Sequence, residues 1–253
     1  MQERIEDNIV IVTLCSGKTN SINGEVLHGL DEIIDRVNNE EALKGLIITG
    51  NGRFFSSGFD LETFINFKTA EEILTWFKFE EETLLKLFTC SKPAVAAING
   101  HAVAAGMIIS MACDYRIVVN NPKTKLGMSE IKIGLALTPA EAEIMKFGLD
   151  SVRNYKDVVF SGEFINPSRA IEMGIFDQVV DSPDDLIEQA KQKVVSLIDT
   201  PGRPYIMLKR LFKQHSAQLI REGIDGNDWT PLVETFFNEA IINTLRAVQG
   251  AMQ

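Results

Sequence analysis

Residues 93–114, PAVAAINGHAVAAGMIISMACD, constrain the fold of this chain more than any other segment. Residues 93–98 form a short apolar run that stops at Asn99-Gly100, which is the pattern of a buried strand closed by a turn. A second apolar run follows at residues 107–113 and is long enough for two turns of helix. A strand that passes into a helix in this way leaves backbone N–H groups unpaired at the helix start, where the macrodipole favours negative charge. The segment therefore predicts an anion or oxyanion site, or else a β-to-α turn whose small residues only allow close packing.

The order of the remaining patterns predicts an α/β protein. Residues 9–14 and 43–49 are predicted strands with a helix at 24–37 between them, so the chain opens as a layered α/β arrangement. Beyond Thr138 the pattern becomes almost entirely helical. We expect a core domain over residues 1–200 and a helical region over 201–253, whose apolar residues cover their own core or a neighbouring subunit. Further strands are predicted at 115–119 and 176–180, and further helices at 69–88, from Pro139, from Pro167, and at 184–198, 204–224 and 231–252.

Charge and cysteine usage limit the classes of partner and compartment. Lys and Arg number 25 against 35 Asp and Glu, and the net charge of -10 disfavours nucleic acid and anionic membranes as partners. The N-terminal segment MQERIEDN has no apolar signal core, and no apolar run reaches transmembrane length. Cys15, Cys90 and Cys113 are odd in number and far apart, which predicts free buried thiols in a reducing compartment. We therefore expect a cytoplasmic protein.

Most kinds of catalytic site find little support in the sequence. There is no Gly-rich phosphate loop, and no cluster of His, Cys and carboxylates has metal-ligand spacing, so we expect no metal. The serines at 56 and 57 have no histidine near them in sequence. Glu130 stands between Met128 and Ile131, and burial there would raise the pKa of its carboxyl toward neutrality, as a general base requires. The alternative for Glu130 is a structural ion pair with Lys125 or Lys132.

Two segments resemble the signatures of one family. Residues 51–61 contain FFSSGFDL and resemble the F-[SC]-A-G-x-D-L signature of the crotonase (enoyl-CoA hydratase/isomerase) superfamily. Residues 93–114 resemble its second signature, in which a strand, Asn-Gly, three small residues and a helix end in Asp. The likeness covers nearly the whole chain. It implies a crotonase-like ββα spiral core with a C-terminal helical trimerisation region, assembled as a homotrimer or a dimer of trimers.

The resemblance also implies an acyl-CoA thioester as the substrate. By position, the N–H groups of Phe59 and Ala105 form an oxyanion hole, and Glu130 is the acid/base residue. No cofactor is implied, because coenzyme A is part of the substrate. Lys209 or Lys213 contacts a CoA phosphate, or else is a solvated helix charge. The remaining residues implied to bind substrate and CoA are Asn20, Ile22, Ser56, Ser57, Gly58, Asp60, Leu61, Ala104, Gly106 and Ile108.

One departure from the family pattern indicates the reaction. The hydratases of the family use two glutamates, and this chain has Ile108 at the first position and Glu130 at the second. A single glutamate with an apolar first position resembles the monofunctional Δ3,Δ2-enoyl-CoA isomerases of fatty acid metabolism, in which one base moves a proton from C2 to C4. The alternatives are hydration, another thioester reaction such as decarboxylation, and a non-catalytic acyl-CoA-binding protein. Whether Glu141 or Glu143 supplies a second acid stays open.

Overall fold

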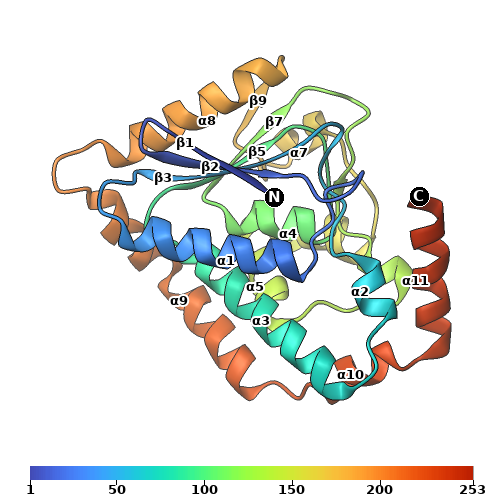
Figure 1. The fold of residues 1–253 in the computed structure, drawn as a ribbon. Coiled ribbons are helices and arrows are strands. Elements are labelled where there is room, and N and C mark those ends of the chain that lie inside the picture. The colour runs from blue at the N-terminus through green and yellow to red at the C-terminus, as the bar shows by residue number, and fades with distance from the viewer. Residues whose placement is uncertain (253) are drawn as a thin grey trace.

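A six-stranded sheet forms the centre of the protein, which a computed structural model describes over residues 1–252 (Figure 1). The strand order is β1-β2-β3-β5-β7-β9, with β1 antiparallel to β2 and every other pair parallel. Strands of a parallel sheet are buried on both faces, which explains continuous apolar runs such as IVIVTL and AVAAI. The predicted strands are confirmed, and β1 was not predicted. The bounds are β1 Gln2–Glu6, β2 Ile9–Leu14, β3 Gly45–Gly50, β5 Ala94–Ile98, β7 Tyr115–Val119 and β9 Gln178–Val180.

A second, smaller sheet follows the strands of the first. It consists of three short parallel strands in the order β4-β6-β8, with bounds Phe54–Ser56, His101–Val103 and Leu126–Gly127. Each follows one strand of the large sheet along the chain, so strand pairs β3-β4, β5-β6 and β7-β8 repeat. Helices or a helical turn come after each pair, and this is the crotonase-like ββα spiral that the sequence predicted. The short strands themselves were not predicted, because two or three residues carry no readable periodicity.

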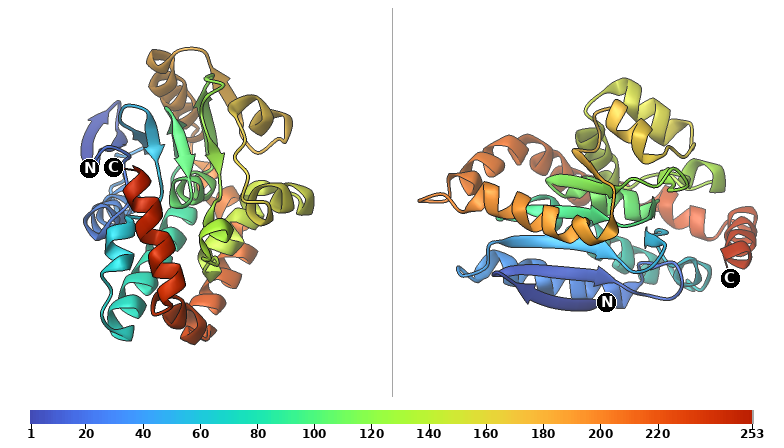
Figure 2. Two further views of the ribbon diagram at one scale, coloured as in Figure 1. Left: turned by 90° about the vertical axis from the view of Figure 1, so that its right-hand side faces the viewer. Right: turned by 90° about the horizontal axis from the view of Figure 1, so that it is seen from above.

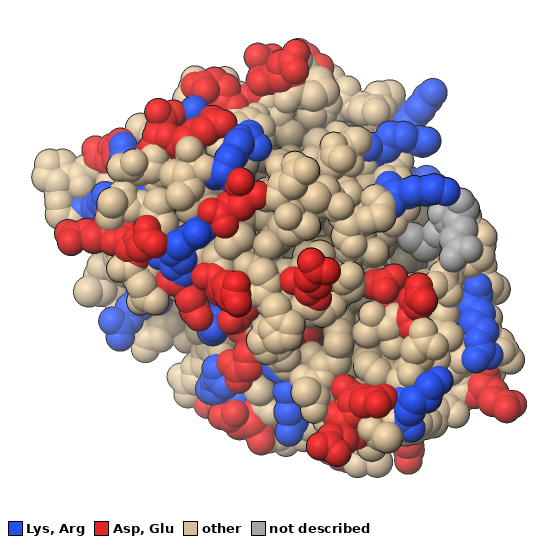
Figure 3. Space-filling view, in the orientation of Figure 1, with Lys and Arg blue, Asp and Glu red and all other residues tan. Residues whose placement is uncertain are grey.

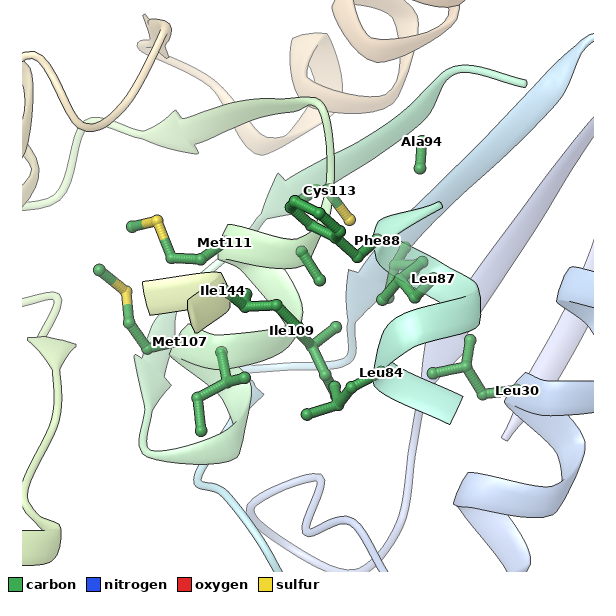
Figure 4. Close-up of a cluster of buried hydrophobic side chains, with 14 of the residues drawn as sticks. Leu30, Leu84, Leu87, Phe88, Ala94, Met107, Ile109, Met111, Cys113 and Ile144 are labelled. Atoms are coloured by element: carbon green, nitrogen blue, oxygen red, sulfur yellow. The ribbon is translucent and has the colours of Figure 1, made fainter. Parts of the chain in front are cut away.

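Helices cover both faces of the large sheet (Figures 1 and 2). On one face lie α1 (Gly24–Asn39), α3 (Ala70–Phe88), α4 (Ala105–Ala112) and α5 (Pro139–Leu149), and on the other lies α8 (Pro183–Ile198). Figure 4 shows the core between α4, α3 and α5, where Met107, Ile109 and Phe88 pack together. The prediction of free cysteines is confirmed, and two of the three, Cys90 and Cys113, are buried. Shorter elements are α2 (Leu61–Ile65), a 3₁₀ turn at Glu130–Ile133, α6 (Val152–Tyr155), a π-helical turn at Lys156–Phe160 and α7 (Pro167–Glu172).

The C-terminal helices are α9 (Pro204–Gly226), α10 (Thr230–Phe236) and α11 (Glu239–Met252). The prediction of a single helix over 231–252 is wrong, because α10 ends at Phe236 and a separate helix begins at Glu239. The Asn238 side chain caps α11 by accepting the Ala240 N–H at 2.9 Å. Phe236 and Leu245 are buried against α2 and α3, so this region covers part of its own core. Met207, Leu208, Leu211 and Phe212 on α9 are exposed. In the described part of the chain, no helix is both long and apolar enough to cross a membrane.

A buried charge cluster fastens α9 to the core. The Asp114 carboxylate lies 2.6 Å from Lys209 Nζ and 2.9 Å from Lys213 Nζ, and it also accepts the Ala94 N–H at 2.8 Å. Lys213 lies over the Phe88 ring, 4.2 Å from its centroid. The two lysines are buried, so both earlier interpretations are wrong: neither is a solvated helix charge, and neither is free to contact a CoA phosphate. Two lysines approach one buried aspartate because they lie four residues apart on the same face of α9.

We predict that Asp114→Asn destabilises the protein severely. The substitution leaves two buried ammonium groups without their counter-charge, and breaking a buried ion pair in this way costs about 3–5 kcal/mol. The free energy of unfolding in urea measures the loss. The matched control is Asp225→Asn, since Asp225 is exposed and lies 3.8 Å from Arg221, where a change within about 0.5 kcal/mol is expected. Equal stabilities of the two variants would contradict the anchoring role.

Candidate active site

A cavity of about 1340 Å³ lies beside the carboxyl ends of the parallel strands. Its lining comes from the loops after β2 and β3, from β6, from residues 123–142 and from α10. Open α/β sheets bind ligands at this position because the loops from neighbouring strands converge there. The loop at 51–60, which the sequence placed at the end of a buried strand, contributes several of the lining residues.

The Phe59 amide lies in a loop that is held against α4. Ile22 N–H donates to the Gly58 carbonyl and Ile22 O accepts from Asp60 N–H, both at 2.9 Å. Because successive peptide groups alternate in an extended segment, the Phe59 N–H points away from Ile22. Gly58 has φ +105°, and a Cβ there would lie 2.6 Å from Ala104 Cβ and 3.3 Å from the Ala105 nitrogen. The absence of a side chain at Gly58 thus lets this loop approach the first amide of α4.

The start of α4 has an unusual backbone. Ala104 has φ 54° and ψ -128°, a conformation that L-residues rarely adopt and that costs about 1–3 kcal/mol when it is maintained. Its own N–H donates to Gly127 O at 3.0 Å, and the next amide, Ala105 N–H, is the first of the helix and so has no intrahelical acceptor. Within residues 1–252, neither the Phe59 nor the Ala105 N–H donates to another backbone group. Two amides without a backbone acceptor therefore lie in neighbouring segments at the helix start that the sequence singled out.

Glu130 presents a buried carboxyl to the cavity. It opens the 3₁₀ turn, lines the cavity, and its Oε2 is buried without a hydrogen-bond partner in the described chain. Burial raises the pKa of Glu130 to about 7, against the opposing effect of hydrogen bonds from backbone N–H groups. The ion-pair alternative is wrong, because Lys132 lies 2.7 Å from Glu163 and the Lys125 ammonium lies over the Phe164 ring. Ile131, which the sequence pattern suggested was buried, is 54% exposed, so the cavity lining and not this neighbour desolvates Glu130.

A second carboxyl lines the same cavity. Glu141 on α5 is buried and accepts the Thr138 N–H at 2.7 Å in a capping box. Burial raises the pKa of Glu141 to about 8, with the negative charges of Glu130 and Glu81 adding to the effect. Glu143 is turned elsewhere: its carboxylate accepts Ser216 Oγ–H at 2.8 Å and lies 3.2 Å from Lys146 Nζ. The question left open by the sequence is thus answered in favour of Glu141 as the residue that reaches the cavity.

Glu80 and Glu81 on α3 lie behind Glu141 and were not predicted. Both are fully buried, Glu81 accepts hydrogen bonds from Thr138 Oγ1 and Ala140 N–H, and neither oxygen of Glu80 has a partner in the described chain. Burial first, and then the neighbouring Glu141 and Glu81 charges, raise the pKa of Glu80 well above its ordinary value. The spacing of residues along α3 could have indicated that both glutamates are buried. The two glutamates fall on the face of α3 that also carries the buried side chains of Ile73, Phe77 and Leu84.

The structure brings only part of the predicted substrate-binding set to the cavity. Asn20, Ser57, Leu61 and Ala104 line it together with Phe59 and Glu130. Ile108 is buried in the hydrophobic core, away from the lining. The other predicted residues outside the lining support the loops: Ile22 and Asp60 through the backbone bonds above, Ser56 by accepting Gly58 N–H at 3.1 Å, and Gly106 by close contact with Ser56. Ala105 and Gly58 are also outside the lining, where Ala105 is buried at the start of α4 and Gly58 lies against it.

Basic side chains at the cavity were also missed. Lys18, Arg53, Lys123 and Lys125 are exposed and line it, which places them at its opening, and His101 lies among them. The buried end is apolar and includes Phe64, Phe77 and Phe236. Figure 3 shows acidic groups spread over one face of the molecule, so a group of five basic or imidazole side chains at one opening departs from the overall charge of -10. The cavity therefore suits an elongated ligand with an anionic head and an apolar end.

A ββα spiral with a cavity lined by Phe59, Ala104 and the Glu130 carboxyl is the architecture of an enzyme of the crotonase superfamily. The sequence model for the enoyl-CoA hydratase/isomerase family matches residues 4–242, and the chain belongs to this family. An acyl-CoA substrate is consistent with membership of this family.

Relatives of both activities resemble the chain. Mitochondrial enoyl-CoA delta isomerase 1 of Mus musculus is 27% identical over 211 residues, which are 83% of this chain and 72% of that protein. A probable enoyl-CoA hydratase of Bacillus subtilis (strain 168) is 25% identical over 187 residues, which are 74% and 71%. Human mitochondrial delta3-delta2-enoyl-CoA isomerase superimposes with a TM-score of 0.89 at 21% identity, covering 100% of this chain and 98% of that one. A probable enoyl-CoA hydratase from Mycobacterium tuberculosis gives 0.79 at 25% identity, covering 89% and 93%.

We predict that Gly58→Ala lowers kcat for enoyl-CoA turnover by about 100- to 1000-fold, the usual effect of losing one oxyanion donor. The added Cβ clashes with Ala104 and is strained at φ +105°, so the Phe59 amide must move. Steady-state kinetics measure the loss. Gly24→Ala is the control, because a Cβ at Gly24 meets nothing within 4 Å. Retention of full activity by Gly58→Ala would exclude the Phe59 amide from the reaction.

Proposed function

We propose that this protein is a Δ3,Δ2-enoyl-CoA isomerase that moves the double bond of an acyl-CoA from C3 to C2. The observation that carries the proposal is the Glu130 carboxyl, which lines the cavity with one oxygen unpartnered and its pKa raised to about 7. A base with a pKa near neutrality is suited to removing a carbon-bound proton next to a thioester. The position of the first hydratase glutamate holds Ile108, which is buried in the core and offers no second base there.

The reaction proceeds through a dienolate. Glu130 removes a proton from C2, and the negative charge that develops on the thioester oxygen is held by the N–H groups of Phe59 and Ala105. Each such donor contributes about 2.7–4 kcal/mol to stabilising the transition state. Protonation at C4 then places the double bond between C2 and C3. The Phe59 ring packs against Trp76 and Phe64, and this apolar lining excludes water that would add to the product.

The basic opening supports coenzyme A as the carrier. Its phosphates are anionic, and Lys18, Arg53, Lys123 and Lys125 place positive charge where the head of the ligand would enter. The acyl chain would extend toward Phe64, Phe77 and Phe236. In this arrangement the thioester carbonyl lies between the basic opening and the apolar end of the cavity, beside Phe59 and Ala104.

Hydration is the second candidate function. It is favoured by Glu141, which places a second carboxyl on the cavity lining, and hydratases of the family use two glutamates. Product analysis separates the two reactions, since a hydratase forms a 3-hydroxyacyl-CoA and an isomerase forms the conjugated 2-enoyl-CoA.

Assembly and location remain expectations. We propose a homotrimer or a dimer of trimers, and the exposed apolar side chains of Leu208, Leu211 and Phe212 on α9 support self-association. A cytoplasmic location stays a prediction from the sequence.

Glu130→Gln tests the proposed function directly. With 3-hexenoyl-CoA, we expect wild-type protein to form the conjugated thioester and Glu130→Gln to lose at least about 100-fold in kcat, because the amide cannot accept the C2 proton. Only the carboxylate form of Glu130 is a base, so wild-type kcat/KM should rise with pH through about 7. Absorbance of the conjugated product follows both experiments.

Glu163→Gln is the matched control for this experiment, because Glu163 is an exposed carboxylate paired with Lys132 and its loss removes the same charge outside the cavity. Equal rates for Glu130→Gln and wild type would refute the assigned base. A wild-type protein that binds acyl-CoA but converts neither 3-enoyl nor 2-enoyl thioesters would favour the non-catalytic alternative.

A further inference from the structure

Glu141 lines the cavity, although its role in capping α5 does not require it to do so. Its helix-capping task uses Oε2, which accepts the Thr138 N–H at 2.7 Å, yet the residue also lines the same cavity as Glu130. A glutamine would serve as well at this position of the capping box. A carboxyl group at this place therefore adds a titratable proton to the cavity without being required by the helix.

The surroundings of Glu141 favour its protonated form. Glu80 lies behind it, fully buried with both carboxyl oxygens unpartnered, and Glu81 is buried beside them. Burial and the nearby charges of Glu130 and Glu81 raise the pKa of Glu141 to about 8. Several carboxyl groups in one buried region cannot all ionise, because like charges at low dielectric repel strongly. At neutral pH this region retains protons on some of its carboxyl groups.

Among residues 1–252, no buried cation neutralises this group of carboxyls. Helix α4, which packs on α5, has no ionisable side chain, and α6 contributes Tyr155 near Glu143. Helix α9 meets α5 through Phe212, Ser216 and Gly223. Its buried ammonium groups, Lys209 and Lys213, are paired with Asp114, and Arg221 is paired with Glu82. The exposed basic groups that line the cavity are those already described at its opening, where they face solvent.

We propose that Glu141 is a second catalytic acid: it donates the proton that reaches C4 of the dienolate, while Glu130 removes the proton from C2. This inference rests on the proposed isomerase function and divides its two proton transfers between two residues. The supporting observations are that both carboxyls line one cavity, that Glu130 Oε2 is buried and unpartnered, and that Glu80 is buried without a partner behind Glu141.

The protons and electron pairs balance. When Glu130 takes the C2 proton, the C–H pair becomes the C1–C2 double bond and the thioester oxygen becomes negative. The Glu141 acid then gives its proton to C4, so that the C3–C4 pair forms the new C–H bond, the C1–C2 pair moves to C2–C3, and the carbonyl re-forms. Glu130 is left as the acid and Glu141 as the carboxylate. Glu130 then releases its proton to solvent and Glu141 takes one up from solvent, which restores the starting state, and no oxidant or further reactant is required.

Isotope transfer distinguishes one acid from two. With 3-hexenoyl-CoA deuterated at C2 in ordinary water, a single residue that serves both carbons can carry deuterium from C2 to C4. Two residues cannot, because the C4 proton comes from Glu141 and so from solvent. We expect no deuterium at C4 of the wild-type product. In Glu141→Gln we expect kcat to fall about 10- to 100-fold and deuterium to be found at C4, since Glu130 is left as the only acid. Mass spectrometry of the product measures the label.

The pH profile gives an independent readout. An acid must carry its proton, so wild-type kcat should fall as pH rises through about 8, and Glu141→Gln should lack this alkaline fall. Glutamine keeps the acceptor for the Thr138 N–H, so the variant retains its capping box, which a thermal melt checks. Glu143→Gln is the matched control, two residues further along α5 and bound to Ser216 outside the cavity, and it should match wild type in rate and label.

The outcomes separate this inference from the proposed function. Deuterium transfer from C2 to C4 by wild-type protein overturns the inference, and so does a folded Glu141→Gln variant with wild-type rate, label and pH profile. In both cases, loss of activity in Glu130→Gln would leave the isomerase function standing. If wild-type protein forms no conjugated product at all, the proposed function fails and this inference fails with it.

Discussion

The close approach of the loop at residues 56–60 to the start of α4 is the contact on which the site depends. Gly58 lies against Ala104 and the Ala105 nitrogen, and Gly106 lies against Ser56, so each segment has a residue without a side chain where the other comes nearest. Steric exclusion sets this requirement, because an added Cβ at either glycine would lie within 3 Å of its neighbour. The backbone strain at Ala104 is maintained by the same packing, at a residue that lines the cavity next to the first amide of α4.

Desolvation of the carboxyl groups in the cavity sets their acid/base properties. The chain is acidic overall, yet the acid/base properties of the cavity come from carboxyls that are removed from water and from countercharges. The lysines that could have neutralised them are used elsewhere, Lys132 on Glu163 and Lys209 and Lys213 on Asp114. Charged groups in ion pairs and carboxyl groups without a cation therefore have different roles in this fold. The paired charges hold α9 on the core, and the carboxyls of Glu130 and Glu141, which have no cation beside them, have pKa values near neutrality.

The sequence predicts the parts of this structure that depend on long periodic segments. Strands such as Ile9–Leu14 and helices such as Ala70–Phe88 follow from apolar spacing, whereas the role of Glu130 was implied by the family resemblance, because its neighbour Ile131 is exposed. The short strands β4, β6 and β8 have no such signal, and the break before Asn238 depends on a local cap. The cavity lining of Glu141 and the burial of Glu80 and Glu81 depend on how α3 packs on α5. That tertiary contact has no local trace beyond the spacing of buried positions along α3.

The C-terminal helical region belongs to the site as well as to the fold. A boundary near residue 200 divides the chain by composition, but Leu232, Thr235 and Phe236 from α10 line the same cavity as Glu130. Phe236 also packs on Phe64 and Phe77, so the apolar end of the cavity is closed jointly by α2, α3 and α10. Because α10 follows directly from α9, which Asp114 fastens to the end of α4, the contacts at the end of α4 also fix the helix that encloses the apolar end of the cavity. The position of α4 and the shape of the cavity are thus set by one connected group of contacts.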